Sequence, residues 1–187
     1  MKRNLTMVMA IMMSGAVWAK QPARGLLGQQ APEWGVTQWL NLPADKNRLD
    51  IADFKGKVVY LYGFQALCSG CHKHGFPTLK EVIATFGDDP DVAIVAVQTA
   101  FEGYHANDID AAKRTVKRYA LNIPVGQSGH DGNPSPLMRR YRSGGTPWTV
   151  IIDRNGIIRF NDFHIDADAA RHLIGTLKAE TGASSTP

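Results

Sequence analysis

Cysteine is scarce in this chain: Cys68 and Cys71 are the only two among 187 residues. A structural zinc site takes four protein ligands at characteristic spacings, and no second pair of cysteines is present to complete one. A disulfide between these two would close a very small loop and would remove little entropy from the unfolded chain. Stability is therefore a poor reason for the pair, which points to a chemical role.

Net charge is also low. The chain has 21 lysine and arginine residues against 17 aspartate and glutamate residues, a formal charge of +4. Loss of Lys2 and Arg3 with an N-terminal leader would halve that excess. So small a charge argues against nucleic acid or a membrane surface as the partner. The length suits one domain with a sizeable core, and the sequence contains no internal repeat.

The longest apolar run lies at the N-terminus and is short for a membrane span. It extends from Leu5 to Val17, whereas a spanning helix needs roughly 20 residues. Lys2 and Arg3 precede it and Val17-Trp18-Ala19 ends it, the three parts of a secretory signal. We predict cleavage and export to a bacterial periplasm, an oxidising compartment; a retained anchor is the alternative. The predicted division is a signal peptide over 1–19, a flexible segment over 20–30, one domain over 31–181 and a disordered tail over 182–187.

The chain is organised around the stretch from Val58 to Glu81. An apolar run over 58–62 predicts a buried strand, Cys68-Ser69-Gly70-Cys71 follows, and a helical pattern then continues to Phe86. Strand, Cys-x-x-Cys and helix in this order are typical of a thioredoxin-like redox site. Unpaired N–H groups and the positive dipole end at a helix start stabilise a thiolate, which is the nucleophile of disulfide exchange. We predict that Cys68 attacks and that Cys71 resolves the mixed disulfide.

The remaining chain alternates between strand and helix patterns, which predicts an α/β fold with parallel pairing. Asn155-Gly156 predicts an antiparallel hairpin near the C-terminus. Pro77 predicts a kink in the helix that follows the cysteines. The expected strands are 39–42, 47–51, 92–98, 123–127, 149–153 and 157–163, and the expected helices cover 108–121, 137–141 and 167–181.

Four pieces of sequence together resemble the exported TlpA-like thiol–disulfide oxidoreductases, within the redoxin group of thioredoxin-fold proteins. They are Ala-Pro-Glu-Trp at 31–34, Phe-Lys-Gly-Lys at 54–57, the Cys-x-x-Cys motif with Pro77 after it, and Gly-Thr-Pro-Trp at 145–148 before the Asn-Gly hairpin. The resemblance implies a thioredoxin-like fold: a central mixed sheet, with a parallel βαβ unit and a C-terminal antiparallel hairpin, flanked by helices.

The resemblance also implies site residues. In such proteins the proline before the penultimate strand is cis; here this is Pro147. Thr146 would then present its backbone to a substrate strand beside the thiols. Trp148 could flank that strand; because it is the first residue of a strand, the alternative is that it belongs to the core. No dissociable cofactor and no metal are expected, because the Cys68–Cys71 disulfide carries the electrons. The implied partners are protein thiols or disulfides and a membrane-bound or soluble redox protein.

Several positions depart from the family pattern. Leu67 stands where tryptophan is common, Ser69-Gly70 where Gly-Pro is common, and Tyr62 where a buried acid or asparagine is common. His74 replaces the glutamate of reductive members, and as a group that titrates near neutrality it could handle protons instead. His72 is a weaker candidate for that role, and a solvated histidine is the alternative for both. Loop position alone suggests that Glu102 and Tyr104 line the site.

Other functions are compatible with parts of the sequence. Cys68 to His72 spells C-x-x-C-H, the attachment motif of c-type haem, with His72 as axial ligand. Two thiols with His72, His74 or His105 could bind copper. The redoxin group also includes thiol peroxidases, but Gln65 stands where their threonine is expected. Exchange of disulfides with protein clients remains the leading prediction.

Overall fold

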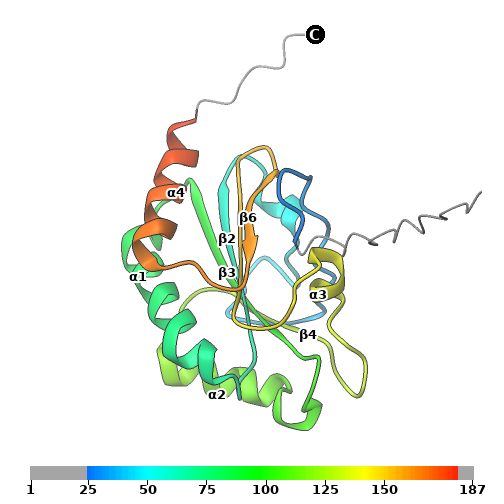
Figure 1. Ribbon diagram of the computed structural model, residues 1–187. Helices are drawn as coiled ribbons and strands as arrows, with labels where there is room; N and C mark the ends of the chain where they lie inside the picture. Colours follow the sequence, from blue (N-terminus) through cyan, green and yellow to red (C-terminus); the bar gives the residue numbers. More distant parts are fainter. Residues whose placement is uncertain (1–24, 181–187) are drawn as a thin grey trace, which may run out of the picture.

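The computed structural model describes residues 25–180, which form one six-stranded sheet with helices on both faces (Figure 1). The strand order is β1-β4-β3-β2-β5-β6. The strands are β1 (Gln38–Leu40), β2 (Val58–Phe64), β3 (Val92–Thr99), β4 (Val125–Ser128), β5 (Trp148–Ile152) and β6 (Ile158–Asp162). The α-helices are α1 (Phe76–Phe86), α2 (Ile109–Tyr119), α3 (Pro136–Tyr141) and α4 (Ala167–Ala179), and short helical turns are η1 (Ile51–Phe54), η2 (Cys71–Gly75) and η3 (Tyr104–Ala106).

Strand β2 occupies the middle of the sheet. It pairs in parallel with β3 and antiparallel with β5, and all seven of its residues are buried. Successive side chains of a strand point to opposite faces, so the uninterrupted run of apolar residues supplies two cores at once. This is why the sequence of β2 shows no polar alternation.

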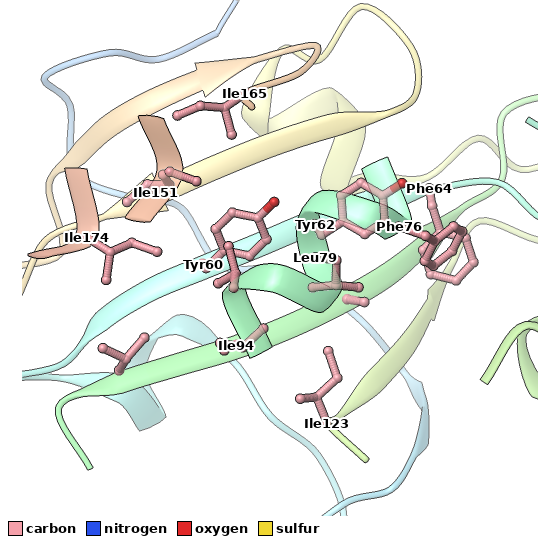
Figure 2. Close-up of a cluster of buried hydrophobic side chains, with 14 of the residues drawn as sticks. Tyr60, Tyr62, Phe64, Phe76, Leu79, Ile94, Ile123, Ile151, Ile165 and Ile174 are labelled. Carbon is pink, nitrogen blue, oxygen red and sulfur yellow. The ribbon is translucent and has the colours of Figure 1, made fainter. Parts of the chain in front are cut away.

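The core on one face lies between the sheet and α1, α2 and α4. Tyr60, Tyr62 and Phe64 of β2 meet Phe76 and Leu79 of α1 there, with Ile174 of α4 closing one side (Figure 2). The opposite core contains the alternate β2 residues, α3 and the segment around Trp34, which is completely buried. Layers on both faces fix the end of β2, where the cysteine motif begins.

The predicted thioredoxin-like fold is confirmed, with a parallel β2-α1-β3 unit and an antiparallel β5-β6 hairpin. The strand predicted over 47–51 is wrong. The Asp50 carboxylate accepts from the backbone N–H groups of Ile51 and Asp53. The Asp53 carboxylate accepts in return from the Asp50 N–H, which completes a capping box that starts η1. Asp50 also accepts from the Trp34 N–H at 2.7 Å.

The helix after the cysteines differs in detail from the prediction. It begins at Ser69 and passes through a π-type turn, η2, before α1 starts at Phe76. Pro77 is the second residue of α1 and directly follows the π-type turn, in which the Phe76 N–H donates to the Cys71 carbonyl five residues earlier. The irregularity predicted at the proline is therefore located in the turn before it.

The flexible segment predicted over 20–30 is wrong for residues 25–30. The Gly28 N–H donates to the Ile158 carbonyl at 2.8 Å, the Ile158 N–H donates to the Gln29 carbonyl at 2.9 Å, and Leu26 is buried. These residues thus extend the sheet beyond β6. The predicted signal peptide, residues 20–24 and the predicted tail lie outside the described residues. Of the helices within 25–180, none has the length and hydrophobicity to cross a bilayer.

Candidate active site

Cys68 and Cys71 lie at the end of β2 and are joined by a disulfide, with their Cα atoms 5.2 Å apart. Their surroundings differ sharply. Cys68 is partly exposed, whereas Cys71 is completely buried in the core beneath α1. An incoming thiol or thiolate can therefore reach the Cys68 sulfur much more readily than the Cys71 sulfur.

The backbone around Cys68 favours a negative sulfur. Helical conformation begins at Ser69, directly after Cys68, and the Cys71 N–H donates to Cys68 Sγ at 3.0 Å. Free N–H groups at the start of a helix carry a partial positive charge. When the disulfide is reduced, this charge stabilises the thiolate of Cys68 over its thiol.

Tyr62 forms the floor of the site and occupies the position where the family often has an acid. Its hydroxyl donates to the Cys71 carbonyl at 3.5 Å. Burial, more than the neighbouring Tyr60 and Tyr119, raises the pKa of Tyr62 well above its usual range. Tyr62 therefore stays a neutral phenol at physiological pH, which can donate a hydrogen bond but cannot take up a proton as a carboxylate would.

His72 is held on both ring nitrogens. Nε2 lies 2.7 Å from the Ala66 carbonyl, and Nδ1 lies 2.7 Å from the Tyr119 hydroxyl. Because a carbonyl only accepts, Nε2 must carry a proton, and a neutral ring then accepts from Tyr119 through Nδ1. The ring also stacks on Phe76 and Tyr119. His72 connects the cysteine turn to α2, and haem ligation through either ring nitrogen would require it to break one of these bonds.

His74 lies on the exposed side of the same turn, away from the groove described below. Its ring centroid is 5.8 Å from that of His164, in the loop between β6 and α4. Partial burial, and then the proximity of His74, lowers the pKa of His164. The structure therefore brings His74 next to a second histidine, a pairing that the sequence did not indicate.

Thr146 and Pro147 approach the cysteine motif from the start of β5, and the peptide bond between them is cis. A Cβ added to Gly70 would lie 3.3 Å from Pro147 Cδ and 4.0 Å from Cys68 Sγ. Glycine between the cysteines therefore allows the proline ring to pack closely against the motif. Thr146 lines a groove of about 620 Å³ that runs past Cys68.

Trp148 lies behind this groove, so the prediction that it flanks a substrate is wrong. It is 4 % exposed, and its Nε1 donates to Asn161 Oδ1. Trp148 pairs with Gly63 in the β2–β5 ladder, which directs its side chain into the second core. Its ring packs edge-on against Phe163, 5.0 Å between centroids, and Phe163 is the residue that lines the groove.

The loop after β3 forms the opposite wall. Phe101, Glu102 and Gly103 line the groove, as does buried Asn107 at the end of the loop. Glu102 is thus found where its loop position suggested. Tyr104 instead donates its hydroxyl to the Phe101 carbonyl at 3.2 Å and braces the loop from behind.

Sequence analysis missed the buried amides that support this wall. Asn107 Nδ2 donates to Gln65 Oε1 at 2.9 Å, Gln127 Nε2 donates to the Asn107 carbonyl at 2.9 Å, and Gln98 Nε2 donates to Gln127 Oε1 at 2.8 Å. Gln98 and Gln127 end two predicted apolar strands, and amides at such positions are a signal that could have indicated a buried network. Gln65, which accepts from Asn107, lies three residues before Cys68, so the network connects the wall to the motif.

Few side chains are placed to act as ligands for the copper or haem iron that the sequence left as alternatives. Within residues 25–180, histidine, cysteine, aspartate and glutamate side chains nowhere gather in the groups of three or more that could hold a metal ion. The Cys68 and Cys71 sulfurs are bonded to each other, and His72 bonds Ala66 and Tyr119.

A thioredoxin-like sheet whose central strand leads into a Cys-x-x-Cys turn defines the class: the protein is a thiol–disulfide oxidoreductase of the TlpA-like redoxin group. Comparison of the sequence with models of protein families gives the family. The chain belongs to the AhpC/TSA family, whose model matches residues 27–161.

Individual relatives agree with this class. The chain is 25% identical over 167 residues to the thiol-disulfide oxidoreductase ResA of Bacillus cereus, covering 83% of this chain and 86% of the relative. The solved thioredoxin-like superfamily protein SPOA0173 is 34% identical with a TM-score of 0.73, covering 81% of this chain and 97% of that one. A thiol-disulfide isomerase from Corynebacterium glutamicum is 29% identical with a TM-score of 0.68, covering 84% and 98%.

Proposed function

We propose that this protein exchanges disulfides with protein clients through Cys68 and Cys71 in a bacterial periplasm. One observation carries the proposal: a partly exposed Cys68 lies in an open groove directly over a completely buried Cys71. A structural disulfide needs no such difference in access. An exchanging pair does, because a client must reach one sulfur while the other waits inside.

The exchange proceeds in two balanced steps. The Cys68 thiolate attacks one sulfur of a client disulfide, an S–S bond forms between protein and client, and the client's other sulfur leaves as a thiolate that takes up a proton. Cys71 then loses its proton and attacks Cys68 Sγ, which closes the Cys68–Cys71 disulfide and releases the second client thiolate. Two electrons move from the protein to the client, and the reverse sequence oxidises a client dithiol. Thr146 would hold the client segment beside Cys68.

Cofactor and partners follow from this chemistry. The Cys68–Cys71 pair itself stores two electrons, so the cycle uses no dissociable cofactor, and the partner that resets the pair is a second redox protein. The apolar run over Leu5–Val17 behind Lys2 and Arg3 supports export by a cleaved signal peptide. Export would place the pair where disulfides form and persist.

Trapping tests the proposal. A Cys71→Ser variant cannot resolve the mixed disulfide, so we expect it to accumulate covalent client adducts that a reductant releases on a non-reducing gel. Cys68→Ser is the matched control and should form none, because its remaining thiol is buried. Equal trapping by both variants, or none by either, would contradict the proposal.

The reduction potential decides the direction of exchange. Equilibration with glutathione, read by mass, should yield one reversible two-electron couple. A value near about −250 mV or below identifies a reductant, and a value near about −120 mV identifies an oxidant that donates disulfides. A pair that fails to cycle between dithiol and disulfide would overturn the proposed function.

Two alternatives from the sequence have direct assays. Reduced protein that consumes hydrogen peroxide faster than it consumes a peptide disulfide would favour the thiol peroxidase.

Proton handling by His74 predicts that His74→Asn shifts the pH–rate profile of disulfide exchange, with His105→Asn as an exposed control. A profile unchanged in His74→Asn would contradict that role.

A further inference from the structure

The groove beside Cys68 is lined by one acidic side chain, by three large apolar side chains and by neutral polar residues such as Ser69 and Thr146. Glu102 is exposed, and it is the only charged residue among the described residues that line the groove. Around it lie Leu67, Phe101 and Phe163. Leu67 directly precedes Cys68 and is 70 % exposed, one of the most exposed large apolar side chains within residues 25–180. The groove therefore offers both a fixed negative charge and apolar contact area.

The backbone that carries Glu102 is firmly anchored. Asn107, 2 % exposed, donates through Nδ2 to the Glu102 carbonyl at 3.1 Å and to the Gly103 carbonyl at 3.3 Å. The same amide donates to Gln65 Oε1 at 2.9 Å. The loop is thereby tied to the segment that leads into Cys68. The backbone of Glu102 is therefore held relative to Cys68, and its exposed side chain extends from that anchored position.

Charge is unbalanced in this groove once the disulfide is reduced. The Cys68 thiolate adds a second negative charge to the groove that Glu102 also lines, and no lysine or arginine is among the lining residues. A client that places a cation there is attracted to both groups, whereas an acidic client is repelled. Such pairing of opposite charges raises encounter rates and selects partners more than it raises affinity.

We propose that Glu102 is a specificity residue and that the preferred clients are extended protein segments with a lysine or arginine next to the exchanging cysteine. Apolar side chains on the same segment contact Leu67, Phe101 and Phe163. This inference rests on the proposed function, since it concerns which clients reach Cys68. Glu102 selects clients by their charge and takes no part in breaking or forming the S–S bonds.

Three peptides that differ at one position test the proposal. Each has a single cysteine linked to the chromophore 2-nitro-5-thiobenzoate, with lysine, glutamine or glutamate as the neighbouring residue. In a single turnover, reduced protein should release the chromophore with second-order rate constants in the order lysine, glutamine, glutamate, as its own Cys68–Cys71 pair becomes oxidised to the disulfide. Each step should be about two- to fivefold, the range for one exposed ion pair, and should shrink at high salt.

The variants separate Glu102 from net charge and from sulfur chemistry. Glu102→Gln should abolish the preference among the peptides, whereas Glu33→Gln, the same change at an exposed site outside the groove, should retain it. Glu33→Gln should reduce the small neutral hydroxyethyl disulfide at the wild-type rate, and Glu102→Gln at that rate or faster, because loss of a negative charge near Cys68 favours its thiolate. A slower rate for Glu102→Gln with that substrate would assign Glu102 to the chemistry and overturn the inference.

The outcomes also distinguish this inference from the proposed function. Exchange with all three peptides at equal rates, or a preference that survives Glu102→Gln, would overturn the role of Glu102 while leaving disulfide exchange supported. No exchange with any peptide or with hydroxyethyl disulfide would overturn the proposed function, and this inference with it.

Discussion

Tyr62 and Gly75 are matched in size beneath the cysteine turn. A Cβ added to Gly75 would lie 2.6 Å from Tyr62 Cζ and 2.8 Å from its Cε2, distances at which one group must move. A smaller residue than tyrosine at position 62 would leave a cavity, and a larger residue than glycine at 75 would clash. The tyrosine that replaces the family's buried acid thus depends on the glycine that follows His74.

This match predicts the effect of Gly75→Ala. Overpacking against Tyr62 should lower the free energy of unfolding by about 1–3 kcal/mol, measured by urea denaturation. The cost should be smaller in a Tyr62→Leu background, because the two residues contact each other and their effects are not additive.

Gly175→Ala in α4 is the matched control. Nothing lies within 4 Å of a Cβ added there, so alanine should stabilise the helix by about 0.5–1 kcal/mol. If Gly75→Ala were equally harmless, the packing of Tyr62 against the turn would be misassigned.

His164 predicts a pH dependence of stability. Its pKa in the folded protein is lowered, first by partial burial and then by His74, whereas in the unfolded chain it titrates near about 6.5. The unfolded chain therefore binds more protons as the pH falls through this value, and stability decreases below pH of about 6.5. Urea midpoints compared at neutral and mildly acidic pH should show a smaller loss for His164→Gln than for wild type. His105→Gln, an exposed control, should lose as much as wild type, and equal losses in all three would contradict the prediction.

Among the secondary-structure elements, those fixed by neighbouring residues could be predicted from the sequence. Strand β2 and the helix after it follow from an apolar run and a motif, and the β5–β6 hairpin follows from Asn155-Gly156. The strand expected over 47–51 could not be excluded, because Asp50 is fixed by the Trp34 N–H, 16 residues away.

In the candidate site, too, the residues that depend on local sequence were predicted and those that depend on distant contacts were not. Cys68 and Cys71 are only three positions apart in the sequence and were identified there. Trp148 was misplaced because its direction depends on its register with Gly63, and the amide support of Glu102 depends on three strand ends meeting. Long-range register is not encoded in local periodicity.

The segment before β1 gives a prediction at the same scale. Leu26 is 7 % exposed and Leu27 is 69 % exposed, although they are neighbours. Leu26→Ala should cost about 2 kcal/mol or more, whereas Leu27→Ala should change stability by no more than about 0.5 kcal/mol. Thermal unfolding of the two variants makes the comparison, and equal melting temperatures would contradict the attachment of residues 25–30 to β6.

In the whole molecule, the site is built on a strand that is shielded from solvent, β2, and is walled on one side by a solvent-exposed loop over residues 101–106. Strand β2 is hydrogen-bonded on both sides and covered on both faces, so its amides should exchange hydrogen only through global unfolding. The amides of residues 101–106 belong to a surface loop and should exchange far sooner. Native-state hydrogen exchange tests this order, and early exchange in β2 would contradict it.

Because Cys71 is buried, the rate at which its thiol is alkylated in the reduced protein reports on unfolding. Cys68 can be capped quickly by an alkylating reagent, after which one thiol remains, sealed beneath α1. That thiol reacts only when the protein opens far enough to expose the core. The slow labelling of Cys71 therefore reports the frequency of such openings. In a crude extract, without purification or denaturant, the fraction of doubly labelled protein would record how often a molecule has lost its fold.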